Sequence, residues 1–225
     1  MNFEYILIII IGVVGMIVQG MLKSKFEKYS RMRLRAGLTG REIAEMMLED
    51  HGIHDVKITS TPGALTDHYN PLKKTVNLSA PVYAADTVAA AAVAAHEVGH
   101  AVQHAVGYRW LKMRSALVPM VSFSSKIVMF LLIGGILMIK TFPQLLLAGI
   151  ILFALTVVFS FITLPVEYDA SARAKKWLEE RGLVTPEEKK GVADALKWAA
   201  RTYVVAALSS LATLLYYLSI YNNRR

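Results

Sequence analysis

Long apolar segments alternate with charged ones along this chain, and their lengths are the first guide to its fold. Residues 3–22 are almost continuously apolar, long enough for a helix to span a hydrocarbon core of about 30 Å. Two further spans, at 121–139 and 145–164, are separated by a short polar stretch and predict a transmembrane hairpin over 121–164. Residues 202–221 are a fourth candidate span, and a half-buried amphipathic helix is the alternative there.

Basic residues gather directly after the first span and predict the orientation of the chain. Because positive charge favours the cytoplasmic side, we expect segment 23–120 in the cytoplasm and the N-terminus outside. The hairpin then returns the chain to the same side, so that 165–201, expected as a helix, is cytoplasmic too. A fourth span would place Arg224 and Arg225 outside, which the same rule weakly opposes. The basic residues concerned are Lys23, Lys25, Lys28, Arg31, Arg33 and Arg35.

The polar segment before the hairpin is patterned for a small α+β domain. Residues 39–51 carry apolar positions at helical spacing. Residues 55–60 alternate as a strand does, and 64–69 and 75–79 look like two more strands around a turn. We therefore predict a mainly α, integral membrane protein with transmembrane helices and a small α+β cytoplasmic domain. The edge of its sheet is suited to binding a peptide as an added strand, and an ordinary structural hairpin is the alternative.

A histidine–glutamate motif lies inside a predicted helix. His96, Glu97 and His100 form the string HEVGH, which has the H-E-x-x-H spacing of zinc hydrolases. The alanine-rich run before it favours a helix, with Asp86 as the expected N-cap. One helical turn places both imidazoles on one face, where they can bind one catalytic Zn²⁺, and Glu97 beside it can take a proton from zinc-bound water. Gly99 suggests close packing on that face. The alternative is an ordinary helix with two core histidines.

A catalytic zinc site needs a third protein ligand, which must be His, Asp or Glu because the chain has no cysteine. His104 continues the helical spacing, but it lies about 12 Å along the helix from His96 and cannot share its metal. The best candidate is Glu167, in the string LPVEYDAS after the third span. A surface position is the default for the remaining histidines, which are His51, His54 and His68.

Three strings together, HEVGHAVQ, VNLSAPVY and LPVEYDAS, resemble the YugP-type membrane zinc metallopeptidases. More distantly they resemble the HtpX and CAAX-prenyl-protease group of gluzincins. The resemblance extends from about residue 69 to about residue 173 and the flanking membrane segments. It implies a zincin-like catalytic domain. It also implies zinc on His96, His100 and Glu167, with Glu97 as the base.

One departure from the HtpX-type pattern concerns the residues around the zinc ligands. That group usually has Asp four residues after the glutamate ligand, where this chain has Ser171. The nearby acid is Asp169 instead, which we expect to hydrogen-bond a zinc histidine. A surface or helix-capping role for Asp169 is the alternative.

The motif and the membrane segments together predict a membrane-embedded zinc metallopeptidase, with an endopeptidase activity. Glu97 would assist the attack of zinc-bound water on a peptide bond. The expected substrate is a peptide or protein near the membrane, and the donor to the oxyanion is His68, Tyr69 or Arg173 by type and location. A metal-binding membrane scaffold without turnover and a zinc hydrolase of a non-peptide substrate are the alternatives. A purely structural site needs no base, so Glu97 argues against the scaffold.

Composition and charge agree with a membrane location. Of the 225 residues, 55% are hydrophobic, which is high for a soluble domain. The formal net charge of +8 comes from basic residues beside the apolar spans, where anionic lipid attracts them. No nucleic-acid-binding motif or aromatic-interleaved basic groove is recognisable, so the expected partner is the lipid bilayer and not nucleic acid. The absence of cysteine fits a domain that faces the cytoplasm. No pattern in the chain predicts an oligomeric state.

Overall fold

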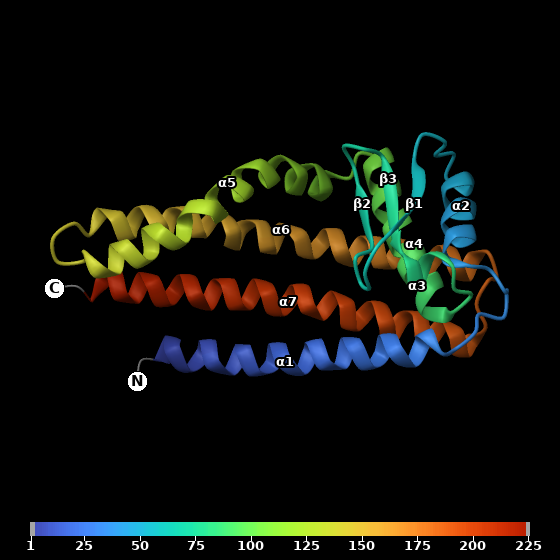
Figure 1. Ribbon diagram of the computed structural model, residues 1–225, viewed down its shortest axis with the longest axis horizontal. Coiled ribbons are helices and arrows are strands. Elements are labelled where there is room, and N and C mark those ends of the chain that lie inside the picture. The colour runs from blue at the N-terminus through green and yellow to red at the C-terminus, as the bar shows by residue number, and fades with distance from the viewer. Residues whose placement is uncertain (1–2, 224–225) are drawn as a thin grey trace. The chain divides into compact units, whose positions relative to one another are not determined.

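Helices make up most of the chain, with one small sheet between the second and third of them (Figure 1). The computed structural model describes residues 3–223, so the predicted position of Arg224 and Arg225 lies outside the described residues. The elements, in chain order, are α1 (Phe3–Ser30), α2 (Gly40–Asp50), β1 (Lys57–Thr61), β2 (His68–Asn70), β3 (Thr75–Ser79), α3 (Ala80–Tyr83), α4 (Val88–Ala105), α5 (Arg109–Leu137), α6 (Gln144–Glu180) and α7 (Pro186–Asn222).

The chain divides into two compact units. Among the described residues, the first unit, called here the apolar unit, comprises 3–18, 112–164 and 202–223. The second, called here the α/β unit, comprises residues 19–111 and 165–201. The sheet and α2 to α4 belong wholly to the α/β unit, whereas α1, α5, α6 and α7 contribute residues to both units.

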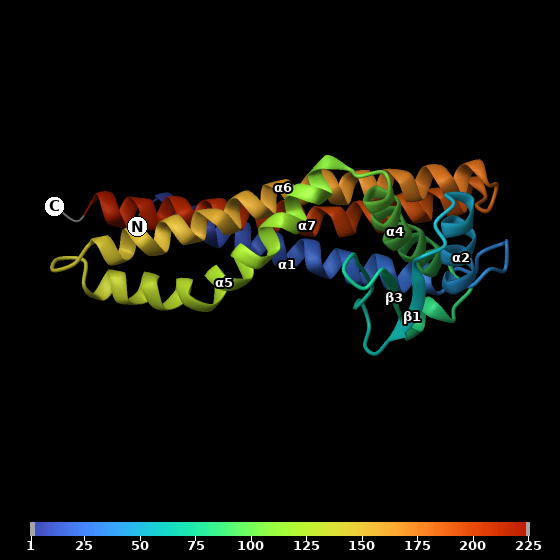
Figure 2. The ribbon, with the colours of Figure 1, turned by 90° about the horizontal axis from the view of Figure 1, so that it is seen from above.

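The apolar unit consists of helices with small residues at their contacts. In the described chain, the helices α1, α5, α6 and α7 are long and apolar enough to cross a membrane. The α5–α6 connection is short, and the two helices lie side by side next to it in both views (Figures 1 and 2). At Gly135 a methyl group would lie only 2.4 Å from the Cα of Leu146, so the hairpin needs glycine there. Ala207 and Ala212 of α7 are buried, as expected for closely packed helices.

Two boundaries differ from the sequence expectation. Helix α5 begins at Arg109, well before the predicted span at 121–139. Segment 165–201, expected as one helix, is instead the end of α6 and the beginning of α7. A left-handed Gly182 (φ +66°) ends the first helix. The second begins with Pro186 after a reciprocal cap, in which the Thr185 N–H donates to Glu188 Oε2 over 2.7 Å.

The sheet of the α/β unit has the order β1-β3-β2. β1 is parallel to β3, and β2 is antiparallel to β3. Because β2 lies at one end of the strand order, it is an edge strand. The strand predicted at 75–79 is confirmed, and the one at 55–60 is shifted to 57–61. The strand predicted over 64–69 is largely wrong, because only its last two residues belong to β2. Gly63 (φ +97°) and Leu65 (φ +58°) have left-handed backbones that a strand does not accommodate.

The core of the α/β unit surrounds α4. Its alanines at positions 89–92, 94 and 95 are all buried, and small side chains let neighbouring elements approach its backbone closely. α2 packs on it through Ile43 and Met47, β3 through Val76 and Leu78, and the last turns of α6 join the same core. The helix that carries the histidine motif is therefore the centre of this unit.

Candidate metal centre

Helix α4 presents His96, Glu97 and His100 on its central turns. The helix begins after Thr87, whose hydroxyl accepts a hydrogen bond from the Ala90 N–H over 3.2 Å, and continues to Ala105 without a break. The two imidazole rings lie 4.8 Å apart between centroids, with their planes at 81°. Glu97 and His100 are buried, and His96 is half-buried. The helical geometry expected of the motif is therefore present.

Helix α6 brings Glu167 to the two histidines. Its Oε2 atom lies 3.3 Å from His96 Nε2 and 3.6 Å from His100 Nε2. The ligand atoms of the three residues all lie within 4.8 Å of one another. Two ligands of a tetrahedral zinc, with bonds of about 2.0–2.2 Å, are about 3.4 Å apart. Two nitrogens and one carboxylate oxygen are also a donor set that zinc prefers, so these residues fit the ion.

Gly99 makes this approach of α4 and α6 possible. A methyl group at Gly99 would lie 2.8 Å from the Ala170 carbonyl oxygen and 3.2 Å from the Ala170 Cα. The predicted close packing on the histidine face is thereby confirmed, and the neighbour is the helix turn that carries Glu167. A larger residue between the histidines would push that turn away.

The two carboxylates of the site have opposite pKa shifts. Burial acts to raise the pKa of Glu167, but hydrogen bonding and attraction from His100 and His96 outweigh it, so the pKa lies far below its ordinary value. Burial raises the pKa of Glu97 to about 7, with His96 opposing the shift and Glu167 adding to it. One carboxylate is thus held ionised among the histidines, while the other can exchange a proton near neutral pH.

Each histidine has a polar partner on the ring nitrogen that faces away from Glu167. His96 Nδ1 lies 3.1 Å from the Ser171 hydroxyl, and His100 Nδ1 lies 3.0 Å from Gln103 Oε1. The expected hydrogen bond from Asp169 to a zinc histidine is therefore wrong. Asp169 accepts hydrogen bonds from Gln103 and Arg173 instead. Ser171, at the position where the HtpX-type pattern has Asp, contacts the histidine itself.

Sequence reasoning missed Gln103 completely. It lies three residues after His100, which is one helical turn, so the spacing makes it a possible partner of that ring. A glutamine on the buried face of an apolar helix was the available signal, because a buried amide needs hydrogen-bond partners.

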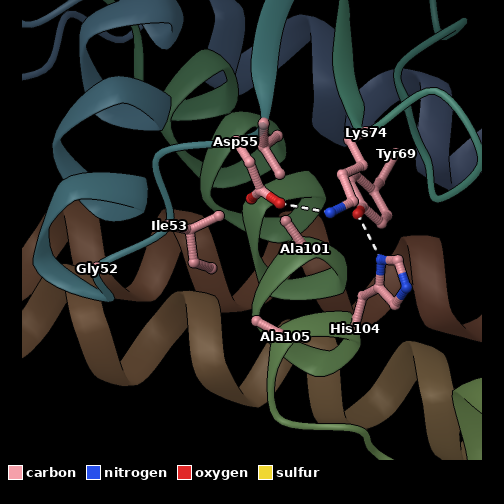
Figure 3. A pocket seen from close by; sticks show the side chains of 9 residues that line it. Gly52, Ile53, Asp55, Tyr69, Lys74, Ala101, His104 and Ala105 are labelled. Carbon is pink, nitrogen blue, oxygen red and sulfur yellow. Dashed lines mark hydrogen bonds and ion pairs between the residues drawn. The ribbon is translucent and has the colours of Figure 1, made fainter.

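The residues considered as oxyanion donors have other contacts. The Tyr69 hydroxyl lies 2.7 Å from His104 Nδ1, and the two side chains point toward each other in Figure 3. The exposed His68 contacts the Thr66 carbonyl through Nδ1, and Arg173 donates to Asp169 over 2.6 Å. His51 and His54 are exposed, as expected. Only the backbone of Tyr69 reaches the centre, where its N–H lowers the pKa of Glu97 against the larger effect of burial.

A cavity with both polar and apolar lining residues lies one helical turn beyond the metal ligands on α4. Its volume is about 230 Å³, and it is lined by α4, Tyr69 of β2, Lys74 and the connection between α2 and β1. Lys74 and Asp55 form an ion pair on its wall (Figure 3). His104 therefore lines this cavity and is not one of the three candidate metal ligands.

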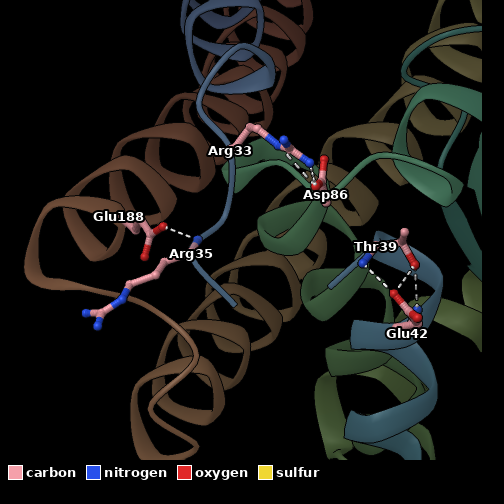
Figure 4. Close-up of polar contacts among 6 residues, drawn as sticks. All are labelled: Arg33, Arg35, Thr39, Glu42, Asp86 and Glu188. Carbon is pink, nitrogen blue, oxygen red and sulfur yellow. Dashed lines mark hydrogen bonds and ion pairs between the residues drawn. The ribbon is translucent and has the colours of Figure 1, made fainter. Parts of the chain in front are cut away.

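The predicted N-cap of α4 has a different role. Asp86 forms an ion pair with Arg33 (Figure 4). Thr87 caps the helix instead. The Arg35 N–H donates to Glu188 Oε1 over 2.6 Å, so two successive contacts hold the segment after α1. Asp86 thus connects this segment to the start of the histidine helix.

Two comparisons with known proteins place the chain in a family. Residues 4–222 match the model of the family described as "Putative neutral zinc metallopeptidase", and the chain belongs to that family. It is 44% identical over 204 residues to the protein named "Putative membrane protease YugP" from Bacillus subtilis (strain 168), covering 91% of this chain and 90% of that protein. No solved structure matches the chain.

Proposed function

We propose that this protein is a membrane-embedded zinc endopeptidase, with one catalytic zinc held by His96, His100 and Glu167. The observation that carries the proposal is the convergence of these ligand atoms within 4.8 Å, directly beside the buried Glu97. The family and the name of the Bacillus relative support the same reading.

The chain's own residues supply the proton transfers. When bound, zinc polarises the scissile carbonyl and lowers the pKa of a bound water toward neutrality. Glu97 accepts the proton of the attacking water and then donates it to the leaving amine. In the metal-free site burial raises the pKa of Glu97 to about 7, and the same burial favours uptake of a proton by this carboxylate over an exposed one. Glu167, whose pKa is low, stays ionised and acts as a ligand.

The edge strand β2 is the proposed binding place for the substrate backbone. It lies at the end of the sheet order, and its Tyr69 N–H is next to Glu97. A peptide added as a further strand would pass the catalytic carboxylate with its scissile bond close by. The proposed substrate is accordingly an extended segment of a peptide or protein near the membrane.

We further propose that the α/β unit is a zincin-like catalytic domain that faces the cytoplasm. The apolar helices suit a multi-pass protein, and the basic residues after the first span favour the cytoplasmic side for segment 23–120. Segment 165–201 returns to the same side after the hairpin. A reporter fused after Arg35 should be cytoplasmic and one in the 140–144 loop external. Finding both on one side would contradict this orientation.

The experiment for the proposed activity compares the wild type with Glu97→Gln in cells. Gln keeps the shape of the side chain but cannot accept a proton, so the variant should retain zinc and lose nearly all hydrolysis. The measurements are the zinc content of the purified protein and a proteome-wide comparison of cleavage products. Cleavage by Glu97→Gln at a rate near that of the wild type would disprove the assigned base. A wild type that binds zinc and changes no cleavage product would favour the scaffold.

A further inference from the structure

Gln103 is fully buried between the two helices that carry the metal ligands. Its exposed fraction is 0%, and its side chain has polar partners on both helices. On α4, Oε1 lies 3.0 Å from His100 Nδ1. On α6, Nε2 donates to the Val166 carbonyl and to Asp169 Oδ2, both over 2.8 Å. The side chain thus connects a metal-binding histidine to the backbone one residue before Glu167.

The partners on α6 determine which way the amide faces. A backbone carbonyl and a carboxylate accept hydrogen bonds and donate none, so the group that faces Val166 and Asp169 must be the NH₂ of Gln103. Its Oε1 then faces His100, and this oxygen can only accept. Nδ1 of His100 must therefore carry a proton, so that in the neutral ring the lone pair is on Nε2, the atom that faces the metal position.

Arg173 holds the next member of this network. Its Nε donates to Asp169 Oδ2 over 2.6 Å, and this is the same oxygen that accepts from Gln103. The pairing with the guanidinium keeps Asp169 in place as an acceptor. One oxygen of Asp169 therefore accepts the hydrogen bonds of both Gln103 and Arg173.

The geometry points to Gln103 as a positioning residue, which fixes His100 in the Nδ1-protonated tautomer and is itself held by Asp169 and Arg173. The role concerns the same metal site as the proposed function and rests on it where zinc is concerned. His96 gives the internal contrast. Its partner Ser171 has a hydroxyl that can either donate or accept, so that contact does not dictate a tautomer.

The first test measures the tautomer of His100 in the metal-free protein by nitrogen NMR of labelled histidine, at a pH high enough for the ring to be neutral, with His100→Gln to assign the signal. We expect the Nδ1–H form in the wild type and its loss in Gln103→Met, which keeps the length of the side chain without hydrogen bonds. Ser171→Ala, the matched control at the other histidine, should leave the His100 signal unchanged. An unchanged tautomer in Gln103→Met would overturn the proposal. This readout needs neither zinc nor turnover, so it can fail independently of the proposed peptidase activity.

The second test uses Asp169, because a folding defect of Gln103→Met would mimic the expected loss. Asp169→Asn keeps one oxygen for both donors and should leave the tautomer and the zinc dissociation constant close to those of the wild type. Asp169→Leu removes that oxygen and should weaken zinc binding by about 10–100-fold. Equal zinc dissociation constants for the Asn and Leu variants, with an Nδ1–H signal in both, would also overturn the proposal.

Discussion

The two units of this protein differ in how far their apolar side chains are exposed. In the apolar unit, Phe130 and Leu137 are 76% and 81% exposed, among many other large apolar residues. In the α/β unit, the alanines of α4 at positions 89–92, 94 and 95 are almost completely buried beneath α2 and the sheet. An exposed apolar surface of this kind suits lipid, whereas a closed core is what the hydrophobic effect produces in water.

This difference explains where the chemistry is located. All three candidate ligands, Glu97 and the partners of both histidines lie in the α/β unit. All of these polar groups except the half-buried His96 are buried, and a buried polar group needs partners that a rigid, closely packed core can hold in place. The helices of the apolar unit approach one another closely at glycine, and within the described residues they present no comparable cluster of metal-ligating side chains.

The largest expected effect is on zinc affinity, and it distinguishes a metal ligand from residues that lie near the site. Glu167→Ala should lower zinc affinity by more than 100-fold, because the site keeps only two protein ligands. Asp169→Ala removes a contact of Gln103 and should cost about 10–100-fold. His104→Ala, in the neighbouring cavity, should leave the affinity unchanged. Zinc titrations of the three purified variants measure these affinities. Full zinc occupancy in Glu167→Ala would show that Glu167 is not a ligand.

Short sequence patterns predict much of the fold. Helix α2 was predicted from apolar spacing, and the structure adds a capping box between Thr39 and Glu42 (Figure 4). Short windows of sequence likewise predict strand β3 and the helix around HEVGH. The four apolar segments were recognisable by length alone. In each case the information lies within about twenty neighbouring residues.

The features that were missed depend on distant segments. Gln103 acquires its role from Val166 and Asp169, which lie 63 and 66 residues away, and no local pattern specifies that contact. The same holds for Ser171, which reaches His96 only because α6 passes α4 at Gly99. The break in segment 165–201 is different, since Gly182 and Pro186 are local signals that the single-helix prediction overlooked.

A smaller effect is expected from pH, and it concerns the metal-free α/β unit. The pKa of Glu97 is raised from 4.5 to about 7, so the unfolded chain releases this proton first as the pH rises. The free energy of unfolding should therefore fall between about pH 4.5 and 7, by up to about 3 kcal/mol. The pKa of Glu167 is lowered, so its stabilisation is complete above its unfolded pKa and is lost only at lower pH.

Glu97→Gln isolates the contribution of that one group. Denaturant unfolding of the metal-free wild type and the variant at several pH values should show a steeper loss of stability in the wild type. Because a nearby cation favours the charged carboxylate, added zinc should flatten the slope of the wild type. Parallel slopes without metal would mean that burial does not hold the proton on Glu97.

The smallest effect tests whether close helix packing is specific to the metal centre. Gly99→Ala places a methyl group 2.8 Å from the Ala170 carbonyl and should destabilise the protein by about 1–3 kcal/mol. It should also lower zinc affinity, because the turn with Glu167 must move. Gly20→Ala, where nothing lies within 4 Å, should be neutral or stabilise α1 by up to about 1 kcal/mol. Thermal unfolding in detergent and zinc titration report the two quantities. If Gly99→Ala lowered stability without changing zinc affinity, α6 would adjust around Ala170 while Glu167 stayed in place, and the glycine would serve packing alone.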